Sequence, residues 1–499
     1  MQGLRSRGPA SLFWTNKPKP NQVAADLRAD ILQLSRPEAH RDHRRLDPQS
    51  SRHLAFPNDN FWNMGKIRRT RFLITLSLLL TSFLQLGASE ELPLMNPIGE
   101  PVGFGDLTLS LEHWLTAPST SAKAPRARIN CMKPTPDGRL FLNDLRGPLY
   151  RIGDDKFTTY LDLRDHLPNF YDQRGLAGGF NFFEFHPEFE RNGLFYTIHS
   201  EEPGKIAPDF GKLNVKQDIA IDCVVLEWKA NDPLAATFSG SFRPIMRVQF
   251  PMHIHFIQDM VFNSYSKPGD EDYGLLYIGV GEGGSMKAGQ ADKIHRLDSI
   301  LGNVIRIDPG GSNSANGQYG IPATNPWASD GDSQTLGENW AIGFRNPHRF
   351  AWDANGRLFV TDIGETNVEE INLVEKGLSY GWPHREGTFE FQLDPNKFGL
   401  LPLPENDEGF TYPVAQFDHM DAAAISGGYF YQGTQHPLLK GKYVFGAIVH
   451  GHLFYLDASE LAQGQLAPIR KFRITADGNE TSMAKLAESG RVDLRLGMD

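Results

Sequence analysis

The chain is poor in cysteine. It has two cysteines in 499 residues, Cys131 and Cys223, and neither lies in a CxxC or CxxCH spacing. Two residues cannot build a disulfide framework, and the missing spacings exclude zinc-ribbon, thioredoxin-like and covalently attached haem classes. We expect two buried strand cysteines, with a single disulfide as the alternative.

Positive charge is also scarce. Lys and Arg number 50 against 60 Asp and Glu, which gives a formal net charge of −10 at pH 7. Affinity for nucleic acid is largely cationic, so this balance argues against a nucleic-acid partner. Hydrophobic residues make up 40% of the chain, and its 49 glycines and 33 prolines indicate a globular, turn-rich protein.

Helical periodicity is almost absent from about residue 97 onward. Short alternating runs follow Asp/Asn-Gly turns instead, which is typical of an all-β fold. Copies of this unit lie at residues 136–152, 191–201, 273–284, 355–365 and 441–456. We interpret each copy as an inner strand and its neighbour in one blade of a β-propeller, because blades bury their faces only against their neighbours. A β-sandwich is the alternative, although it needs fewer such units.

An export signal is predicted inside the chain. A basic stretch at 64–71 precedes an apolar run at 72–86 and the small residues Gly87, Ala88 and Ser89. This order predicts a signal peptide over 64–89, cleaved after Ser89, and a periplasmic or secreted domain at 90–499 with no stable membrane span. Residues 1–63 are then an upstream misreading of the start codon or a disordered extension. A signal-anchor with a cytoplasmic tail is the alternative.

Several loop motifs occur together and in a fixed order. They lie at 174–196 (RGLAGGFNFFEFHPEFERNGLFY), 301–311 (LGNVIRIDPGG), 319–328 (YGIPATNPWA), 340–353 (WAIGFRNPHRFAWD) and 362–387 (DIGETNVEEINLVEKGLSYGWPHREG). With these motifs the chain, over roughly 97–499, resembles the soluble dehydrogenases of glucose, aldoses and sorbosone that depend on pyrroloquinoline quinone (PQQ).

The resemblance implies a fold and an activity. The fold is a six-bladed β-propeller, and the activity is hydride transfer from an aldose or similar alcohol to PQQ, with Ca²⁺ bound and an external electron acceptor. The same propeller occurs in Hedgehog-interacting proteins that only bind partners. A non-catalytic binding propeller is therefore the alternative.

His255 is the predicted general base, since a neutral imidazole can take a hydroxyl proton near pH 7. The resemblance places a catalytic His five residues before the strand that begins at Met260. Ile257 and Gln258 depart from the two glycines that the family often has there. His253 is a competing base. On a strand both rings would share one face, so a metal pair of a metal-dependent hydrolase is a further alternative.

Arg345 and Asn346 match an Arg-Asn pair that faces the cofactor in the family. A fixed cation beside the quinone oxygen stabilises the negative charge that develops there, so Arg345 is predicted to be catalytic as well as cofactor-binding. Gln173 falls where the family has a glutamine that contacts sugar or cofactor. A solvated glutamine is the alternative.

Calcium would be bound by oxygens of the loop at 362–367. Gly364 and Glu365 match the two ligand positions of the family, which often has proline at the second. Glu365 could serve through its carbonyl or its carboxylate. Glu370 and Tyr380 match a second, structural calcium site, but we favour a strand carboxylate and a packed aromatic ring there.

Two departures weaken the prediction of an enzyme. Val449, next to His450, stands where glucose-oxidising members have a lysine that reaches the quinone. The arginines that bind the PQQ carboxylates match only loosely to Arg491 and Arg495. The sequence stops at Asp499, where a further Asp-Gly-x-Leu-Tyr unit would be expected, so either the chain is a fragment or its last blade is incomplete, which would leave an unpaired sheet edge.

Overall fold

The computed structural model describes residues 92–173, 178–211, 220–393 and 398–498. The predicted extension at 1–63 and the predicted signal peptide at 64–89 lie outside these residues. Among the described residues, no helix is long and apolar enough to span a membrane.

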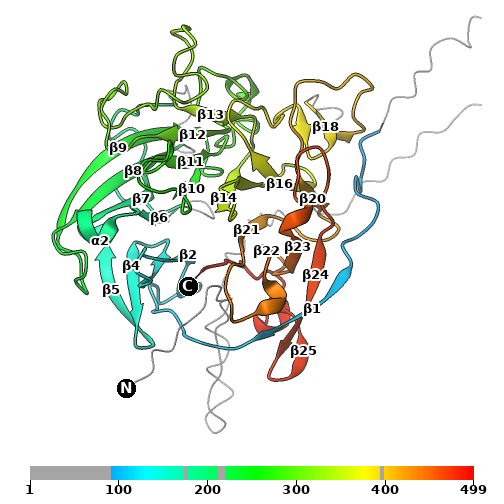
Figure 1. Ribbon diagram of the computed structural model, residues 1–499, viewed down its shortest axis with the longest axis horizontal. Helices are drawn as coiled ribbons and strands as arrows, with labels where there is room; N and C mark the ends of the chain where they lie inside the picture. Colours follow the sequence, from blue (N-terminus) through cyan, green and yellow to red (C-terminus); the bar gives the residue numbers. More distant parts are fainter. Residues whose placement is uncertain (1–91, 174–177, 212–219, 394–397, 499) are drawn as a thin grey trace, which may run out of the picture. The chain divides into compact units, whose positions relative to one another are not determined.

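The described residues form a succession of antiparallel sheets (Figure 1), each built mainly from strands consecutive in the chain. The first two are β2 (Ile129–Pro134), β3 (Leu140–Asp144), β4 (Pro148–Gly153) and β5 (Lys156–Asp162), then β6 (Phe180–Phe185), β7 (Leu194–Glu201), β8 (Ile221–Ala230) and β9 (Gly240–Phe250). The next two are β10 (Ile257–Phe262), β11 (Leu276–Val280), β12 (Asn303–Ile307) and β13 (Asn339–Ile342), then β14 (Pro347–Trp352), β15 (Leu358–Asp362), β16 (Val368–Val374) and β20 (Ala415–Asp418).

The last large sheet contains the C-terminal strands and one N-terminal strand. Its members are β21 (Ile425–Phe430), β22 (Lys442–Ala447), β23 (Leu453–Asp457), β24 (Arg470–Ala476) and β25 (Asn479–Thr481), with β1 (Phe104–Leu111) parallel to β24. A small sheet of β17 (Arg385–Glu386), β18 (Phe389–Gln392) and β19 (Gly399–Leu401) lies in the connection from β16 to β20. The α-helices of the described residues are short: α2 (Phe189–Asn192) and α3 (Met483–Leu486).

The first strand of each large sheet packs against the first strand of the next. Contacts run from β2 to β6, from β6 to β10, from β10 to β14 and from β14 to β21. Such an order of inner strands is the arrangement of a β-propeller, so the all-β prediction is confirmed. The described residues contain five large sheets, so six blades are not established.

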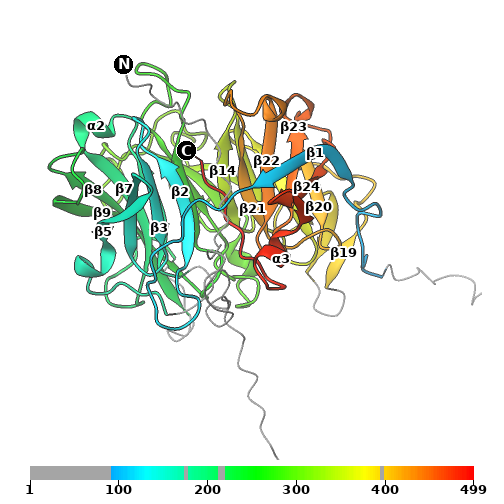
Figure 2. The same cartoon turned by 90° about the horizontal axis from the view of Figure 1, so that it is seen from below.

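The C-terminal segment lies between β2 and β21, the first strands of the first and last large sheets (Figures 1 and 2). The Leu494 N–H donates to the Ile448 carbonyl at 3.0 Å, and the Met498 N–H donates to the Met132 carbonyl at 3.3 Å. The segment thereby links the two ends of the succession of sheets.

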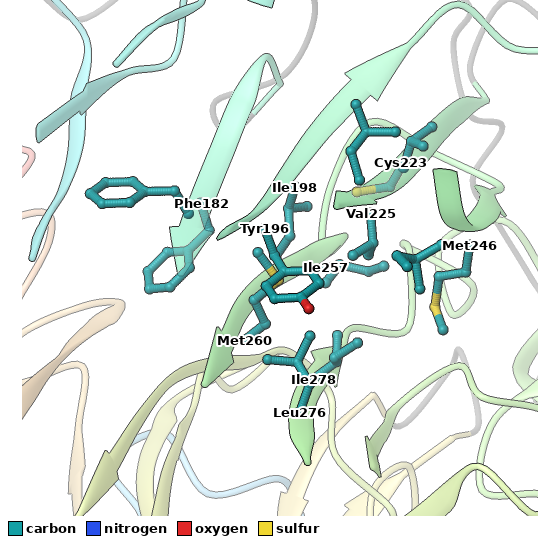
Figure 3. Packing of buried hydrophobic residues seen from close by; sticks show 14 of the residues in the cluster. Phe182, Tyr196, Ile198, Cys223, Val225, Met246, Ile257, Met260, Leu276 and Ile278 are labelled. Atoms are coloured by element: carbon teal, nitrogen blue, oxygen red, sulfur yellow. The ribbon is translucent and has the colours of Figure 1, made fainter. Parts of the chain in front are cut away.

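The core forms where neighbouring sheets meet. One cluster spans the first three large sheets, and Figure 3 shows part of it, with Tyr196, Val225 and Met260 among the side chains packed together. Most strand residues are buried on both faces, as expected of sheets packed between neighbours. Cys131 and Cys223 are both free and buried in this core, so the prediction of two strand cysteines is confirmed and the disulfide alternative is wrong.

The repeated sequence unit marks a different strand from the one we expected. Three of the copies, such as 273–284, cover the second strand of a large sheet alone, and the copies at 136–152 and 441–456 cover the second and third strands. The Asp/Asn-Gly turn lies between the first and second strands, which is why the motif follows it. The innermost strands do not carry the unit.

Candidate active site

The candidate residues gather where four strands share one end. His255 precedes β10 and Glu282 follows β11, and the two strands pair with Ile257 opposite Val280. Arg345 precedes β14 and Glu365 follows β15 in the next sheet, where Pro347 is opposite Asp362. The Glu282 N–H donates to the Arg345 carbonyl at 2.8 Å, which joins the loops of the two sheets.

His255 is held by a carboxylate. Its Nδ1 lies 2.6 Å from Oε1 of Glu282. The same carboxylate accepts from the N–H groups of Gly284 at 2.9 Å and Met286 at 3.0 Å. The sequence VGEGG therefore folds into a turn that fixes Glu282 and, through it, the orientation of the imidazole.

The backbone at His255 adopts an uncommon conformation. Its φ of 52° lies in the left-handed region, which non-glycine residues seldom adopt and which often occurs at functional sites. The His255 carbonyl accepts from the Gly283 N–H at 3.0 Å. A Cβ on Gly281 would lie 2.3 Å from that carbonyl oxygen, so this position requires glycine.

The electrostatic environment keeps His255 neutral. Burial and the charge of Arg345 lower its pKa, and Glu282 offsets only part of that effect. Burial alone would raise the pKa of Glu282, but the hydrogen bond from His255 and nearby positive charge leave it lowered. A neutral imidazole that donates from Nδ1 to an ionised carboxylate presents an unprotonated Nε2, which is the form of a general base.

Arg345 is buried beside this pair and is itself paired. Its Nε donates to Oε2 of Glu365 at 2.8 Å, and its Nη1 donates to the Ile363 carbonyl at 2.8 Å. Oε1 of Glu365 lies 3.2 Å from Nζ of Lys287. Both carboxylate oxygens of Glu365 therefore face cations, which disfavours the carboxylate as a calcium ligand and leaves the main-chain carbonyl.

The loop before β14 is anchored by Asp362. Its carboxylate accepts from the N–H groups of Arg345 at 2.9 Å and Asn346 at 2.6 Å. The Asn346 Oδ1 is buried and has no hydrogen-bond partner among the described residues. The loop thus contains a buried polar atom without a hydrogen-bond partner among the described residues, at the residue that follows Arg345.

The comparison with protein families tests the resemblance that the loop motifs indicated. A family model described as Glucose / Sorbosone dehydrogenase matches residues 128–479. The chain belongs to the glucose/sorbosone dehydrogenase family. The resemblance inferred from the loop motifs is therefore confirmed.

The curated relatives include an aldose sugar dehydrogenase as well as HIPL and Hedgehog-interacting proteins. The chain is 28% identical over 372 residues to the HIPL1 protein of Arabidopsis thaliana, a match that covers 63% of this chain and 50% of that protein. It is 27% identical over 187 residues to aldose sugar dehydrogenase YliI of Escherichia coli, covering 35% and 42%. It is 24% identical over 277 residues to human Hedgehog-interacting protein, covering 55% and 33%. The chain spans about half the length of the first of these relatives, or less for the others.

A solved structure with the same fold is that of the soluble aldose sugar dehydrogenase from Escherichia coli in the apo-form. It matches with a TM-score of 0.53 at 20% identity, over 75% of this chain and 96% of that one. At this identity the match concerns the fold, and it agrees with the propeller arrangement of the family.

Gln173 is not joined to this group of residues by a described contact. Its side chain is exposed and donates to the carboxylate of its neighbour Asp172. Residues 174–177, the start of the motif that follows it, lie outside the described residues. Gly364 lies in the loop after β15, where a Cβ would come within 2.0 Å of the Val368 carbonyl.

The strand expected to carry both histidines is absent. Residues 251–255 form a bent segment, and β10 begins only at Ile257. The prediction of a strand through His253 and His255 is therefore wrong, and His255 instead has a left-handed φ. Within the described part of the chain, no group of three His, Cys, Asp or Glu side chains could hold a metal ion.

Glu370 and Tyr380 fit the interpretation favoured from the sequence, a strand carboxylate and a packed aromatic ring. Glu370 lies on β16 and is hydrogen-bonded to Nδ2 of Asn372 at 2.9 Å. Tyr380 stacks on Phe344 with ring centroids 4.7 Å apart, and its hydroxyl donates to the Leu373 carbonyl at 2.7 Å.

The C-terminal arginines Arg491 and Arg495 differ in their hydrogen-bond partners. Arg495 donates from Nε to Oδ1 of Asn130 at 3.0 Å, and its charge contributes to the lowered pKa of His348. Arg491 has a buried Nε with no partner among the described residues. Val449 pairs through its backbone with Val492 in the same region.

The sequence did not predict three residues of the candidate site: Glu282, Lys287 and His348. Glu282 had a visible indication, an acidic residue between glycines at the end of a predicted strand. His348 is buried, and burial followed by the charges of Arg349, Arg495 and His255 lowers its pKa well below the usual value. Its Nδ1 has no partner among the described residues.

Proposed function

We propose that this chain is a PQQ-dependent dehydrogenase of aldoses or similar alcohols. The observation that carries the proposal is the pair of His255 and Glu282 next to buried Arg345, at one end of the sheets. Membership of the glucose/sorbosone dehydrogenase family supports the substrate class.

His255 is the base of the proposed reaction. Its Nε2 takes the proton of the substrate hydroxyl, while the hydrogen on the carbon that bears this hydroxyl leaves as hydride. PQQ, when bound, supplies the quinone carbonyl that accepts this hydride. Oxidation of each alcohol releases two electrons, so the reaction also requires an external electron acceptor.

Arg345, Asn346 and Gln173 are proposed to hold the cofactor. The guanidinium group suits a planar carboxylate, and the unpaired Asn346 Oδ1 is a polar atom that a ligand can complete. Arg345 would also stabilise negative charge on a bound oxygen. Ca²⁺ would be held by the main-chain carbonyls of Gly364 and Glu365, since the Glu365 carboxylate is already paired.

A non-catalytic binding propeller is the second candidate. It is favoured by the matches to HIPL1 and to Hedgehog-interacting protein, and by the ion pair that Glu365 already makes with Arg345. In this case Arg345 is a structural residue of the loop, and the protein would not take up PQQ.

Reconstitution separates the two candidates. Purified protein is mixed with PQQ and CaCl₂, quinone absorbance is followed after removal of free cofactor, and dye reduction is measured with glucose and other aldoses. A dehydrogenase retains the absorbance and reduces the dye, whereas a binding propeller does neither.

The base is tested by a pair of substitutions. His255→Ala should abolish dye reduction while retaining cofactor absorbance, since a base acts in chemistry more than in binding. His253→Ala, two residues away and outside the contact with Glu282, should have a mild effect. The reverse pattern would assign the base to His253.

Export and ring size are further proposals. We propose a periplasmic or secreted protein with a signal peptide at 64–89, which predicts that N-terminal sequencing of exported material begins near Glu90. A sequence from residues 1–63 would contradict it. We also propose a ring of six blades, which an experimental structure of the exported protein can test.

A further inference from the structure

A cavity lies at the opposite end of the strands from His255. It has a volume of about 350 Å³, and its walls come from two neighbouring sheets. Tyr277 near the start of β11, Trp352 at the end of β14 and Leu358 at the start of β15 are among its lining residues. Glu282 and Glu365 follow the other ends of β11 and β15. At about 3.3 Å per residue, a five-residue strand separates the two ends by roughly 13 Å.

Aromatic rings form one wall of this cavity. Tyr277 packs edge-on against Trp340, with centroids 5.5 Å apart, and against Trp352, with centroids 5.1 Å apart. Both indole nitrogens are buried and lack a hydrogen-bond partner among the described residues. Buried polar groups without a partner are rare in folded proteins, and each calls for an explanation such as an ordered water or a bound molecule.

The charged groups of the lining are balanced. Arg306 is buried over the Trp340 ring at 4.0 Å and is fixed by hydrogen bonds to Asn325 at 2.7 Å and Thr324 at 2.6 Å. In all, the lining has three acidic and three basic side chains: Glu271, Asp272, Glu375, Arg306, Arg357 and Lys376. Their formal charges cancel, so the cavity does not favour an ion of either sign.

We infer that this cavity binds a neutral sugar. A sugar ring has an apolar C–H face that packs on aromatic side chains, and its hydroxyls both donate to carboxylates and accept from guanidinium and ammonium groups. The volume lies at the small end of the range of small-molecule sites, about 300–1,000 Å³, which suits one or two sugar units. The site is separate from the proposed active site and does not depend on the proposed function.

The test is a binding titration of the full-length protein with glucose and with maltose, by calorimetry and by saturation-transfer NMR. We expect saturable binding of at least one sugar. Trp352→Leu, which removes the flat ring, should weaken it by about tenfold. Glu271→Gln changes an exposed rim residue and should also weaken binding, so the test stands even if the tryptophan variant fails to fold. Trp114→Leu is the matched control, since Trp114 lies outside the cavity and bonds to Asp155 at 2.8 Å.

Weaker binding in both cavity variants with an unchanged Trp114→Leu protein supports the inference. Three results would overturn it. One is the absence of saturable binding of either sugar. Another is sugar binding that both cavity variants leave unchanged, which would place it at the His255 end. The third is tighter binding of inorganic phosphate than of sugar. Failure to take up PQQ would reject the proposed function without bearing on this cavity.

Discussion

At the scale of the residue, the proposed chemistry depends on one hydrogen bond. His255 could be chosen from the sequence because its position matched the family and its side chain suits a base. Glu282, which holds Nδ1 of His255 at 2.6 Å, was not chosen, because its partner lies 27 residues away and the contact arises from the β10–β11 pairing.

Glu282→Gln should lower the rate of dye reduction by about a hundredfold or more, as for other general-base contributions. The amide has no negative charge to stabilise the imidazolium that forms when His255 takes a proton. Because Glu282 raises the pKa of His255, its loss should lower that pKa further. The acidic limb of the pH–rate profile should therefore move to lower pH.

A matched control for this change is Glu405→Gln, an exposed carboxylate outside both proposed sites, which should leave the profile unaltered. If Glu282→Gln reduced the rate only through lower stability, the limb would stay in place and the melting temperature would fall instead. Cofactor absorbance in the variant distinguishes a defect in chemistry from one in binding.

At the scale of the element, the turn after β11 positions His255. Gly281→Ala would bring a Cβ within 2.3 Å of the His255 carbonyl oxygen, so the backbone must shift. We expect a loss of about 1–3 kcal/mol of unfolding free energy, as for overpacked sites, and a marked loss of activity. Denaturant unfolding and dye reduction measure the two effects.

Gly153→Ala serves as the control for this prediction. A Cβ there would meet no atom within 4 Å, so its effect should stay within about 0.5 kcal/mol. Equal losses in the two variants would mean that the close approach at Gly281 does not constrain His255.

The sequence predicted elements better than their positions in the blade. The turn and alternating pattern at 355–365 correctly predicted a strand, now β15, but not that it is the second strand of its sheet. The innermost strands, such as β10, are buried on both faces and lack a turn motif. The prediction that His253 and His255 lie on one strand failed for another reason. His255 has a left-handed φ, and its carbonyl accepts a hydrogen bond from the glycine turn after β11.

Whole-molecule stability should depend on a buried acidic pair between two strands. Asp362 of β15 is the cross-strand partner of Glu370 of β16. Burial, with the neighbouring carboxylates, raises the pKa of Glu370 to about 8 and that of Asp362 to about 7. The pair therefore favours a bound proton in the folded state at neutral pH.

The sign of the pH dependence follows from these raised pKa values. The folded state binds protons more tightly than the unfolded chain, in which such carboxyls titrate near pH 4. The contribution of the pair to stability is fully present below that pH and is lost as the pH rises through the folded pKa values. Unfolding free energy should thus fall between about pH 4 and pH 8.

Glu370→Gln tests this expectation because it mimics the protonated acid. The Gln amide can still accept from the Gly387 N–H, and a flip of the Asn372 amide would let its unpaired Oδ1 accept from the new NH₂ group. The variant should match the parent protein near pH 4 and be more stable than it near pH 9, as measured by denaturant unfolding across that range. Glu405→Gln, at a surface carboxylate, is the control. Its unfolding free energy should depend on pH as that of the parent protein does. A variant with the parent slope would mean that Glu370 is ionised in the folded protein, and that its hydrogen bonds outweigh the cost of burial.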